Sequence, residues 1–370
     1  MHFAFDETQE DLRRTVRDFL ADTASENETR RVMKTERGHD EAVWRRMGAE
    51  LGLQGLAVPE EYGGAGAGPV EVGLVMEEMG RALLCAPFLS SAVLATTAIV
   101  RSDDERARAE LLPGLASGDS VATLALTEDS ARWDREGVAL SARPAGDGWL
   151  LDGHKTFVLD GATADVVLTV ARTAEGIGLF RVDAGAEGLT RSVLPTLDPT
   201  RRQARLEYRG VAARPLRTRG DGWDLVAAVL HHGIAALAAE QVGVASRVLD
   251  MAVEYAKVRH QFGRAIGSFQ AVKHLLADVL MDVESARAAA YAALLALQDG
   301  RDVPAATSLA KAFCSDACLK ATESNIQVHG GIGFTWEHPA HLYFKRAKTS
   351  QLLFGDPAHH RELLAQAIGV

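Results

Sequence analysis

The residues from Tyr255 to His274 combine side chains and turn signals that could bind a phosphate-bearing ligand. Arg259 carries a planar guanidinium whose five donors suit a phosphate, and Phe262 adds a flat apolar ring beside it. Gly263 and Gly267 let the backbone approach a ligand closely. The set could hold the pyrophosphate and adenine of a dinucleotide. The alternative is an ordinary solvated turn between two helices.

A second glycine-rich stretch, IQVHGGIGFTWEHP, runs from Ile326 to Pro339. After a helix, Gly330, Gly331 and Gly333 would let backbone amides face a ligand. Gly330 on its own is equally suited to end the helix as a C-cap. The sequence therefore contains two separate places where backbone and side-chain donors could meet an anion.

Together the strings R-x-Q-F-G-R-x-I-G-x-F-Q and Q-x-x-G-G-x-G-F-x-x-E-x-P closely resemble signatures of the acyl-CoA dehydrogenase family of flavoproteins. In that family these strings contact the ADP half of FAD, and the FAD is the one whose flavin ring works in the neighbouring subunit. The resemblance implies that this chain binds FAD in the same way. The residues that would carry the contact are Arg259, Phe262, Gln270, Gln327 and Gly331.

The resemblance also implies a reaction, the desaturation of an acyl-CoA between its α and β carbons. A carboxylate removes the α proton while a hydride leaves for the flavin, and an electron-transferring flavoprotein accepts the electrons. Relatives place the catalytic glutamate at one of two positions, which correspond here to Phe354 in LLFGDP and to Gly233. Neither residue can accept a proton.

Two nearby acids are candidates for a displaced base. Asp356 follows Phe354 by two residues, and Glu240 lies two helical turns beyond Gly233. A buried carboxylate in an apolar helix needs a partner, so Glu240 suits a structural contact across helices better than catalysis. Asp356 precedes Pro357 and is well placed to cap the last helix.

The strings that build the flavin site within one chain depart from the family pattern. Thr127 opens the string that corresponds to T-E-P-G-x-G-S-D, but the glycine turn is lost and Trp133 occupies the serine position. In K-T-F-V-L-D-G, Phe157 replaces the tryptophan that covers the flavin, and Leu159 replaces the threonine near its N5 edge. Thr127 and Phe157 are retained as candidate flavin contacts; Leu159 has no donor and suits an ordinary strand.

This pattern resembles the second subunit of bacterial α2β2 acyl-CoA dehydrogenases, in which one chain supplies the base and the other completes the cofactor pocket. The leading hypothesis is therefore a non-catalytic subunit that assembles with a same-fold partner, on a bulky acyl-CoA such as a steroid side-chain ester. One alternative is a self-sufficient homo-oligomer with a displaced base. Another is a family-fold flavoprotein, or a structural partner, without desaturase activity.

Periodicity predicts an α+β chain in three parts. Residues 1–120 show helical spacing, and Asp6 or Thr8 could cap the first helix. Residues 121–215 contain short β-branched runs separated by turn residues, typical of a small antiparallel sandwich or barrel. Residues 216–370 return to helical spacing and predict a four-helix bundle with one helix capped by Ser268. The resemblance implies the same order of domains.

The composition of the chain indicates which kinds of partner and which cellular compartment to expect. The chain has 370 residues and a net charge of −10 without a basic block, so we expect no nucleic-acid partner. Its longest apolar run, Leu225 to Ala239, is interrupted by two histidines and is too short to span a bilayer, so no membrane contact is expected. Three cysteines indicate a reducing compartment, and we expect Cys314 and Cys318 to be buried apolar side chains. The acidic, amphipathic N-terminal segment is unlike a signal peptide, which favours the cytoplasm.

Overall fold

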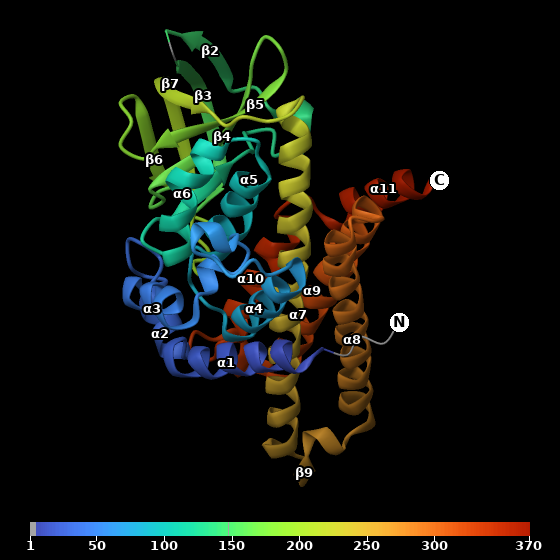
Figure 1. The fold of residues 1–370 in the computed structure, drawn as a ribbon. Coiled ribbons are helices and arrows are strands. Elements are labelled where there is room, and N and C mark those ends of the chain that lie inside the picture. Colours follow the sequence, from blue (N-terminus) through green and yellow to red (C-terminus); the bar gives the residue numbers. More distant parts are fainter. Residues whose placement is uncertain (1–4, 147) are drawn as a thin grey trace. The chain divides into compact units, whose positions relative to one another are not determined.

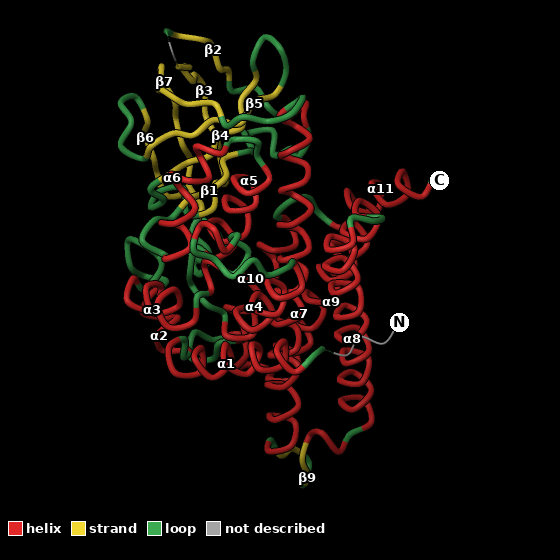
Figure 2. The backbone as a smooth tube through the Cα atoms, in the orientation of Figure 1, coloured by secondary structure: helices red, strands yellow, loops and turns green. Residues whose placement is uncertain are grey.

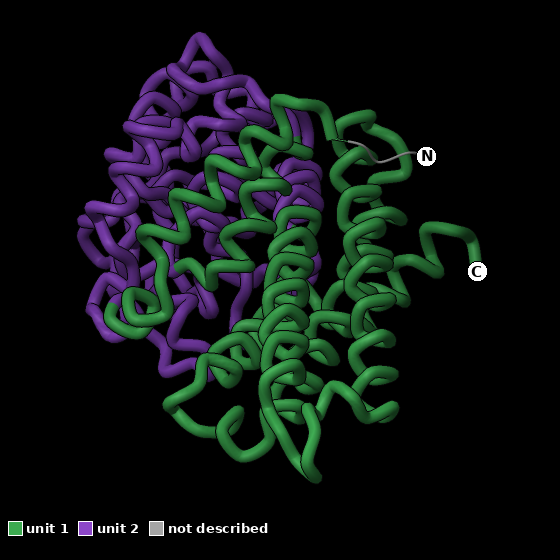
Figure 3. The backbone as a smooth tube through the Cα atoms, turned by 90° about the horizontal axis from the view of Figure 1, so that it is seen from below, with its two compact units in different colours: residues 1–31, 69–84, 234–370 green, residues 32–68, 85–233 purple. Residues whose placement is uncertain are grey.

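A computed structural model describes residues 5–146 and 148–370 of the chain. Part of the N-terminal segment considered above, residues 1–4, lies outside these described residues. The chain forms two compact units (Figure 3). Unit 1 consists of residues 1–31, 69–84 and 234–370, and unit 2 of residues 32–68 and 85–233. Helices dominate unit 1, whereas the seven-stranded β-sheet belongs to unit 2. Figure 2 distinguishes the helices from the strands.

The expected fold class is confirmed: helices precede and follow a central β-region. The helices before the sheet are α1 Glu7–Thr23, α2 Glu26–Val32, α3 Glu41–Leu51, α4 Pro69–Ala82, α5 Thr96–Arg101 and α6 Glu105–Ser117, with the π-helix η3 Phe88–Ala95 before α5. Asp6 caps α1, as predicted, because its side chain accepts a hydrogen bond from the Gln9 amide and the Gln9 side chain returns one.

The sheet contains strands β1 Ala122–Ala125, β2 Ser141–Ala145, β3 Gly148–Leu159, β4 Val166–Arg172, β5 Ile177–Asp183, β6 Leu189–Val193 and β7 Gln203–Pro215 (Figure 1). Its strand order is β1-β4-β2-β3-β7-β5, and pairing of β4 with β5 closes it into a small barrel. The prediction of an antiparallel sheet was wrong in part, because β1 and β2 both pair with β4 in parallel. The core between the strands contains Leu151, Val167, Phe180, Leu206 and Val211, all buried.

Residues Gly148–Leu159 form one long strand, β3. Its pairing with β7 shifts register between Lys155 and Val158. Phe157 lies in this bulge with a positive φ of 55°, and Asp160 just beyond has a φ of 50°. A bulge leaves an extra residue unpaired and re-aims its side chain, so Phe157 is 41% exposed between the buried Thr156 and Val158.

Five helices follow the sheet in residues 216–370, all of which the structure describes. They are α7 Gly222–Val258, α8 Gln270–Asp299, α9 Val303–His329, α10 Ala340–Leu352 and α11 Pro357–Ile368 (Figure 1). The four expected helices are present, and α10 is additional. Helix α9 packs along α8, α10 and α11. Among described residues only α7 is long and apolar enough for a membrane span, and 78% of that window is buried, as is usual in a core helix.

Helices α4 and α7 approach closely because glycines face each other's backbone. A Cβ on Gly243 would lie 1.8 Å from the Glu77 carbonyl oxygen, and one on Gly80 would lie 2.1 Å from that of Glu240. Any larger side chain would therefore push the two helices apart. This contact places two adjacent acids of α4, Glu77 and Glu78, in the interior of unit 1.

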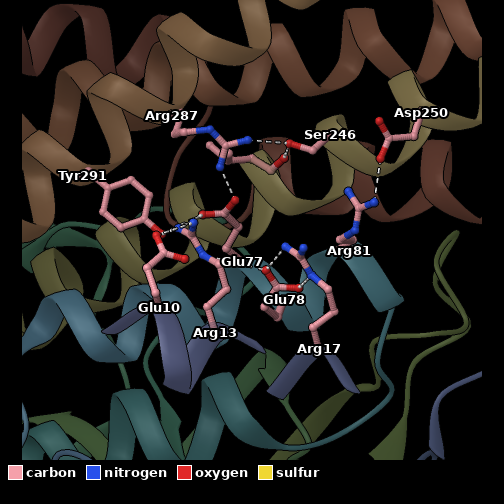
Figure 4. Close-up of polar contacts among 11 residues, drawn as sticks. Glu10, Arg13, Arg17, Glu77, Glu78, Arg81, Ser246, Asp250, Arg287 and Tyr291 are labelled. Atoms are coloured by element: carbon pink, nitrogen blue, oxygen red, sulfur yellow. Dashed lines mark hydrogen bonds and ion pairs between the residues drawn. The ribbon is translucent and has the colours of Figure 1, made fainter. Parts of the chain in front are cut away.

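Basic and phenolic side chains of two helices, α1 and α8, surround these acids (Figure 4). Glu77 accepts hydrogen bonds from Arg287 and Tyr291 of α8, and Glu78 forms a bidentate pair with Arg17 of α1. Buried charges are stable only with such partners. The network therefore ties α1, α4 and α8 into one body.

Candidate functional site

A β-hairpin with a two-residue turn connects α7 to α8 (Figure 1). It lies in the first stretch that was predicted to bind a nucleotide. Strands β8 His260–Gln261 and β9 Arg264–Ala265 pair antiparallel, with Phe262 and Gly263 at the turn. Both turn residues have positive φ, 53° and 77°. Turns of this kind favour asparagine or glycine at both positions, so phenylalanine at position 262 works against local stability.

The hairpin presents its predicted binding residues to solvent. Phe262 is 92% exposed, and Arg259 and Gln270 are also exposed. Among described residues the Arg259 guanidinium has no hydrogen-bond or ion-pair partner. The Arg264 guanidinium lies 4.1 Å from the centre of the Phe269 ring, and that ring contacts Phe262 edge-on at 6.1 Å. These contacts fix the direction in which the hairpin points.

Ser268 is not the cap of α8. Its hydroxyl donates to the Ala265 carbonyl, and Phe269 is the residue that precedes the helix. Ser268 is the last residue of a 3-10 turn over Ile266–Ser268, and α8 begins two residues later at Gln270. The prediction was therefore wrong by one residue, because Ser268 closes the hairpin side of the junction.

The second predicted stretch lies at the end of α9. Gly330 ends the helix with a φ of 63°, as expected for a C-cap, and its amide bonds the Gln327 and Ile326 carbonyls. Gln327 and Gly331 are exposed. No atom lies within 4 Å of a Cβ built on Gly331, so its backbone is open to a ligand.

An aromatic contact brings the two stretches together. The rings of Tyr255 and His329 stack with their centres 4.3 Å apart and their planes 26° apart. Tyr255 precedes Arg259 by one helical turn, and its carbonyl accepts a hydrogen bond from the Arg259 amide. Gln327 lies two residues before His329 and Gly331 two residues after it. The stack therefore places both motifs at the same end of the helices of unit 1.

These residues suit the ADP half of a dinucleotide. They offer an unpaired guanidinium, a strained and exposed aromatic ring, and an open glycine backbone. A phosphate prefers such a fork of donors, and an adenine prefers a flat ring. A cavity of about 330 Å³ elsewhere in unit 1, lined by residues that include Arg17, Arg247 and Tyr343, contains none of the predicted site residues.

The residue at the position of the family's C-terminal base, Phe354, is buried. Phe354 is 3% exposed and has a φ of 62° in the loop between α10 and α11. Its carbonyl contacts Nε2 of the buried His360 at 2.9 Å, and the Lys311 ammonium donates to the Gln351 carbonyl at 2.9 Å. Burial lowers the pKa of Lys311 to about 7 and that of His360 to about 4. The loop is therefore fixed on both sides.

Both candidate replacement acids have structural partners. Asp356 is exposed and accepts a hydrogen bond from the His359 amide, so it caps α11 as predicted. Glu240 is 3% exposed, and its Oε1 lies 2.7 Å from a guanidinium nitrogen of Arg346 in α10. Arg346 also donates to the Leu84 carbonyl. The Glu240 carboxylate is therefore held in a buried ion pair that fixes it against α10. At the remaining base position, Gly233 is buried within α7.

In the β-domain, the two candidate flavin contacts behave differently. The Thr127 side chain is buried, and its hydroxyl donates to the Thr156 carbonyl at 2.7 Å. Phe157 is exposed in the bulge of β3. Leu159 is buried, which agrees with its interpretation as an ordinary strand residue. Of these two candidates, Phe157 is the one with an exposed ring that could cover a ligand.

Sequence reasoning missed a buried ion pair between Glu128, which follows Thr127, and Lys155, which lies two residues before Phe157. The Lys155 ammonium, fully buried, donates to Glu128 Oε1 at 2.7 Å and to the Leu126 carbonyl at 2.8 Å. Glu128 also accepts from the Ala139 and Leu140 amides. Burial lowers the pKa of Lys155 to about 8. The sequence signal that could have revealed the pair is an acid, Glu128, and a base, Lys155, each next to an apolar run that resembles a strand.

The predicted fate of the cysteines is confirmed, since Cys314 and Cys318 are buried free thiols. Burial raises the pKa of Cys314 to about 12, so neither thiol is reactive at neutral pH.

Sequence comparisons agree with the geometry. Models of the acyl-CoA dehydrogenase N-terminal, middle and C-terminal domains match residues 6–119, 123–209 and 220–369. The acyl-CoA dehydrogenase IpdE2 of Mycolicibacterium smegmatis is 36% identical over 355 residues, which cover 95% of this chain and 96% of IpdE2.

Solved structures give the same result. A variant of the steroid ACAD Tcur3481-Tcur3483 is 34% identical with a TM-score of 0.90, covering 98% of both chains. The ChsE4-ChsE5 complex from Mycobacterium tuberculosis is 29% identical with a TM-score of 0.92, covering 100% of this chain and 99% of that one. The chain belongs to the acyl-CoA dehydrogenase family.

Proposed function

We propose that this chain is the non-catalytic subunit of an acyl-CoA dehydrogenase assembly. It binds a partner subunit of the same fold and holds the ADP half of that partner's FAD, while the partner supplies the catalytic carboxylate. The observation that carries the proposal is the absence of an available proton acceptor at either family position, where Phe354 and Gly233 are both buried and apolar.

The contacts of the two alternative acids strengthen this reading. A displaced base must reach the α proton of a substrate and must accept it near neutral pH. Glu240 is held by Arg346 in the core, and Asp356 holds the first turn of α11. Using either acid as a base would break a contact on which the local structure depends.

The exposed nucleotide-binding residues support the other half of the proposal. Arg259, Phe262, Gln270, Gln327 and Gly331 lie on the surface, with the two motifs joined by the Tyr255–His329 stack. FAD, when bound, supplies the hydride acceptor for α,β-desaturation. The residues of this chain bind and orient its ADP half, and they do so from outside the partner's own fold.

The compared structures suggest the type of partner and substrate. One is named as a complex of two proteins, ChsE4 and ChsE5, and another pairs two names in a steroid ACAD. We infer a cytoplasmic heterotetramer that acts on a bulky acyl-CoA ester, with electrons passing to an electron-transferring flavoprotein as the family resemblance implies.

The proposal is tested by purifying this chain alone and together with a same-fold acyl-CoA dehydrogenase subunit that carries the catalytic glutamate. Alone, the chain should be nearly colourless and inactive; the complex should be yellow and should bleach on addition of acyl-CoA. Arg259→Gln in this chain should lower the FAD affinity of the complex roughly 10- to 100-fold, because one charged hydrogen-bond donor is worth about 1.5–3 kcal/mol.

Arg301→Gln is the matched control, because Arg301 is an exposed arginine in the turn between α8 and α9. It should leave FAD binding unchanged, and neither substitution should alter the size of the assembly. A yellow homotetramer of this chain alone that desaturates an acyl-CoA would refute the proposal. In that case Glu240→Gln and Asp356→Asn would identify a displaced base.

A further inference from the structure

Three aromatic rings form a column where α7, α9 and the segment before α10 meet in unit 1. The Tyr255 ring stacks on His329 at 4.3 Å, and His329 meets His338 at 4.2 Å with a 42° angle between the rings. His329 and His338 stand at unspecified positions of the second family string, and Tyr255 precedes the first string by four residues. The stack nevertheless links Tyr255, one turn before Arg259, with His329, which lies between Gln327 and Gly331 in the chain.

Hydrogen bonds orient both imidazoles. Nδ1 of His329 lies 2.9 Å from the Asn325 carbonyl, so this nitrogen carries a proton and donates. Nδ1 of His338 accepts the Ala340 amide at 3.2 Å, which requires that nitrogen to be unprotonated. The His338 contact is therefore made by a neutral ring, with its proton on Nε2.

Burial favours the same neutral state. Desolvation lowers the pKa of His329, and it lowers that of His338 with a further contribution from His329. The charged groups that act on His338 and on His341 are Glu26 and Arg30 of α2, and Lys345 of α10 acts on His341. The basic groups and the burial together outweigh the carboxylate, so an added proton is unfavourable in this column.

The column lies between the two parts of the proposed site. Tyr255 accepts the Arg259 amide hydrogen bond at the last turn of α7. His329 is the last residue of α9, directly before Gly330 and Gly331. His338 follows Gly331 by seven residues and lies two residues before α10 begins at Ala340. A shift of any ring moves one motif relative to the other.

We infer that Tyr255, His329 and His338 are positioning residues that set the two halves of the ADP-binding site at their working separation, and that neutral imidazoles are required for it. The inference rests on the proposed function. The rings need not touch the cofactor; they hold Arg259 on one helix end and Gln327 and Gly331 on the other.

The test compares ring-keeping and ring-removing variants of the full chain in complex with its partner. Tyr255→Leu removes the stack and should weaken FAD binding about 10-fold, because an aromatic pair is worth roughly 0.5–1.5 kcal/mol and 1.4 kcal/mol is a factor of ten. Tyr255→Phe keeps the ring and should bind FAD as the natural protein does. His329→Leu is a second ring-removing variant, in case Tyr255→Leu folds poorly.

His329→Phe separates stacking from titration. It should retain FAD at pH 7, and it should lose less FAD than the natural protein when the pH falls from 7 to 5.5. Equal losses in the two proteins would contradict the requirement for a neutral His329.

Hydrogen exchange of residues 326–339, measured on this chain without FAD, gives the independent readout. Exchange should accelerate in Tyr255→Leu and His329→Leu but not in Tyr255→Phe. If exchange and FAD affinity do not change together, the rings do not position the site and the inference is wrong. If no complex retains FAD, including the natural one, the proposed function fails, while exchange still decides whether the stack orders this segment.

Discussion

Glu240 of α7 and Arg346 of α10 form a 2.7 Å ion pair, with side-chain exposures of 4% and 2%. The residues are 106 positions apart in the chain. Removing one member of such a pair leaves an uncompensated buried charge, at a cost of about 3–5 kcal/mol. The pair therefore favours a structural role for the Glu240 carboxylate.

Glu240→Gln should lower the free energy of unfolding by about 3–5 kcal/mol, measured by denaturant unfolding. The double variant Glu240→Gln/Arg346→Met should be less destabilised than the sum of its single variants, because no charge is then left buried. Glu50→Gln is the control, since the Arg46–Glu50 pair is exposed on α3, and it should barely move the unfolding midpoint. Full stability of Glu240→Gln combined with a large loss of activity would instead indicate a catalytic carboxylate.

Phe262 occupies a positive-φ turn position that suits asparagine better than phenylalanine. Phe262→Asn should therefore leave the melting temperature unchanged or slightly raised. It should nevertheless reduce FAD retention in the complex, because the exposed ring is lost. Flavin absorbance per assembled complex measures the effect, and Phe262→Tyr should preserve it. A normal flavin content in Phe262→Asn would mean that the ring serves another purpose.

The lowered pKa of His360 predicts that the free energy of unfolding decreases at acidic pH. Burial lowers its pKa from 6.5 to about 4, so between these values the unfolded chain binds a proton that the folded chain does not. Stability from this group is fully present above pH 6.5 and declines as the pH falls toward 4. Between pH 7 and pH 5 the loss is about 2 kcal/mol.

His360→Gln keeps a donor for the Phe354 carbonyl but does not titrate. The difference in unfolding free energy between pH 7 and pH 5 should shrink by about 2 kcal/mol in this variant. His274→Gln, at an exposed position on α8, is the comparison and should keep the natural pH dependence. An unchanged difference in His360→Gln would show that other groups cause the acid sensitivity.

Local signals in the sequence predicted much of this protein. Asp6 and Asp356 cap their helices, and Gly330 ends α9, because capping depends only on residues within one turn. The glycine-marked motifs likewise identified the family and the junction between α7 and α8. The same kind of reasoning missed α10, since buried polar residues such as Arg346 and Ser350 interrupt its apolar face. The short strands β2 and β6 are largely exposed and carry no clear alternation.

The sequence by itself determined the order of helices and strands, the nucleotide-binding strings and the lack of a glutamate at positions 233 and 354. Tertiary structure alone decided which charges and rings meet. It pairs Glu240 with Arg346, buries Lys155 on Glu128, and stacks Tyr255 on His329 across 74 residues of chain. Such contacts depend on how distant elements pack, and no local pattern records them, because burial and partnership exist only once the chain has folded.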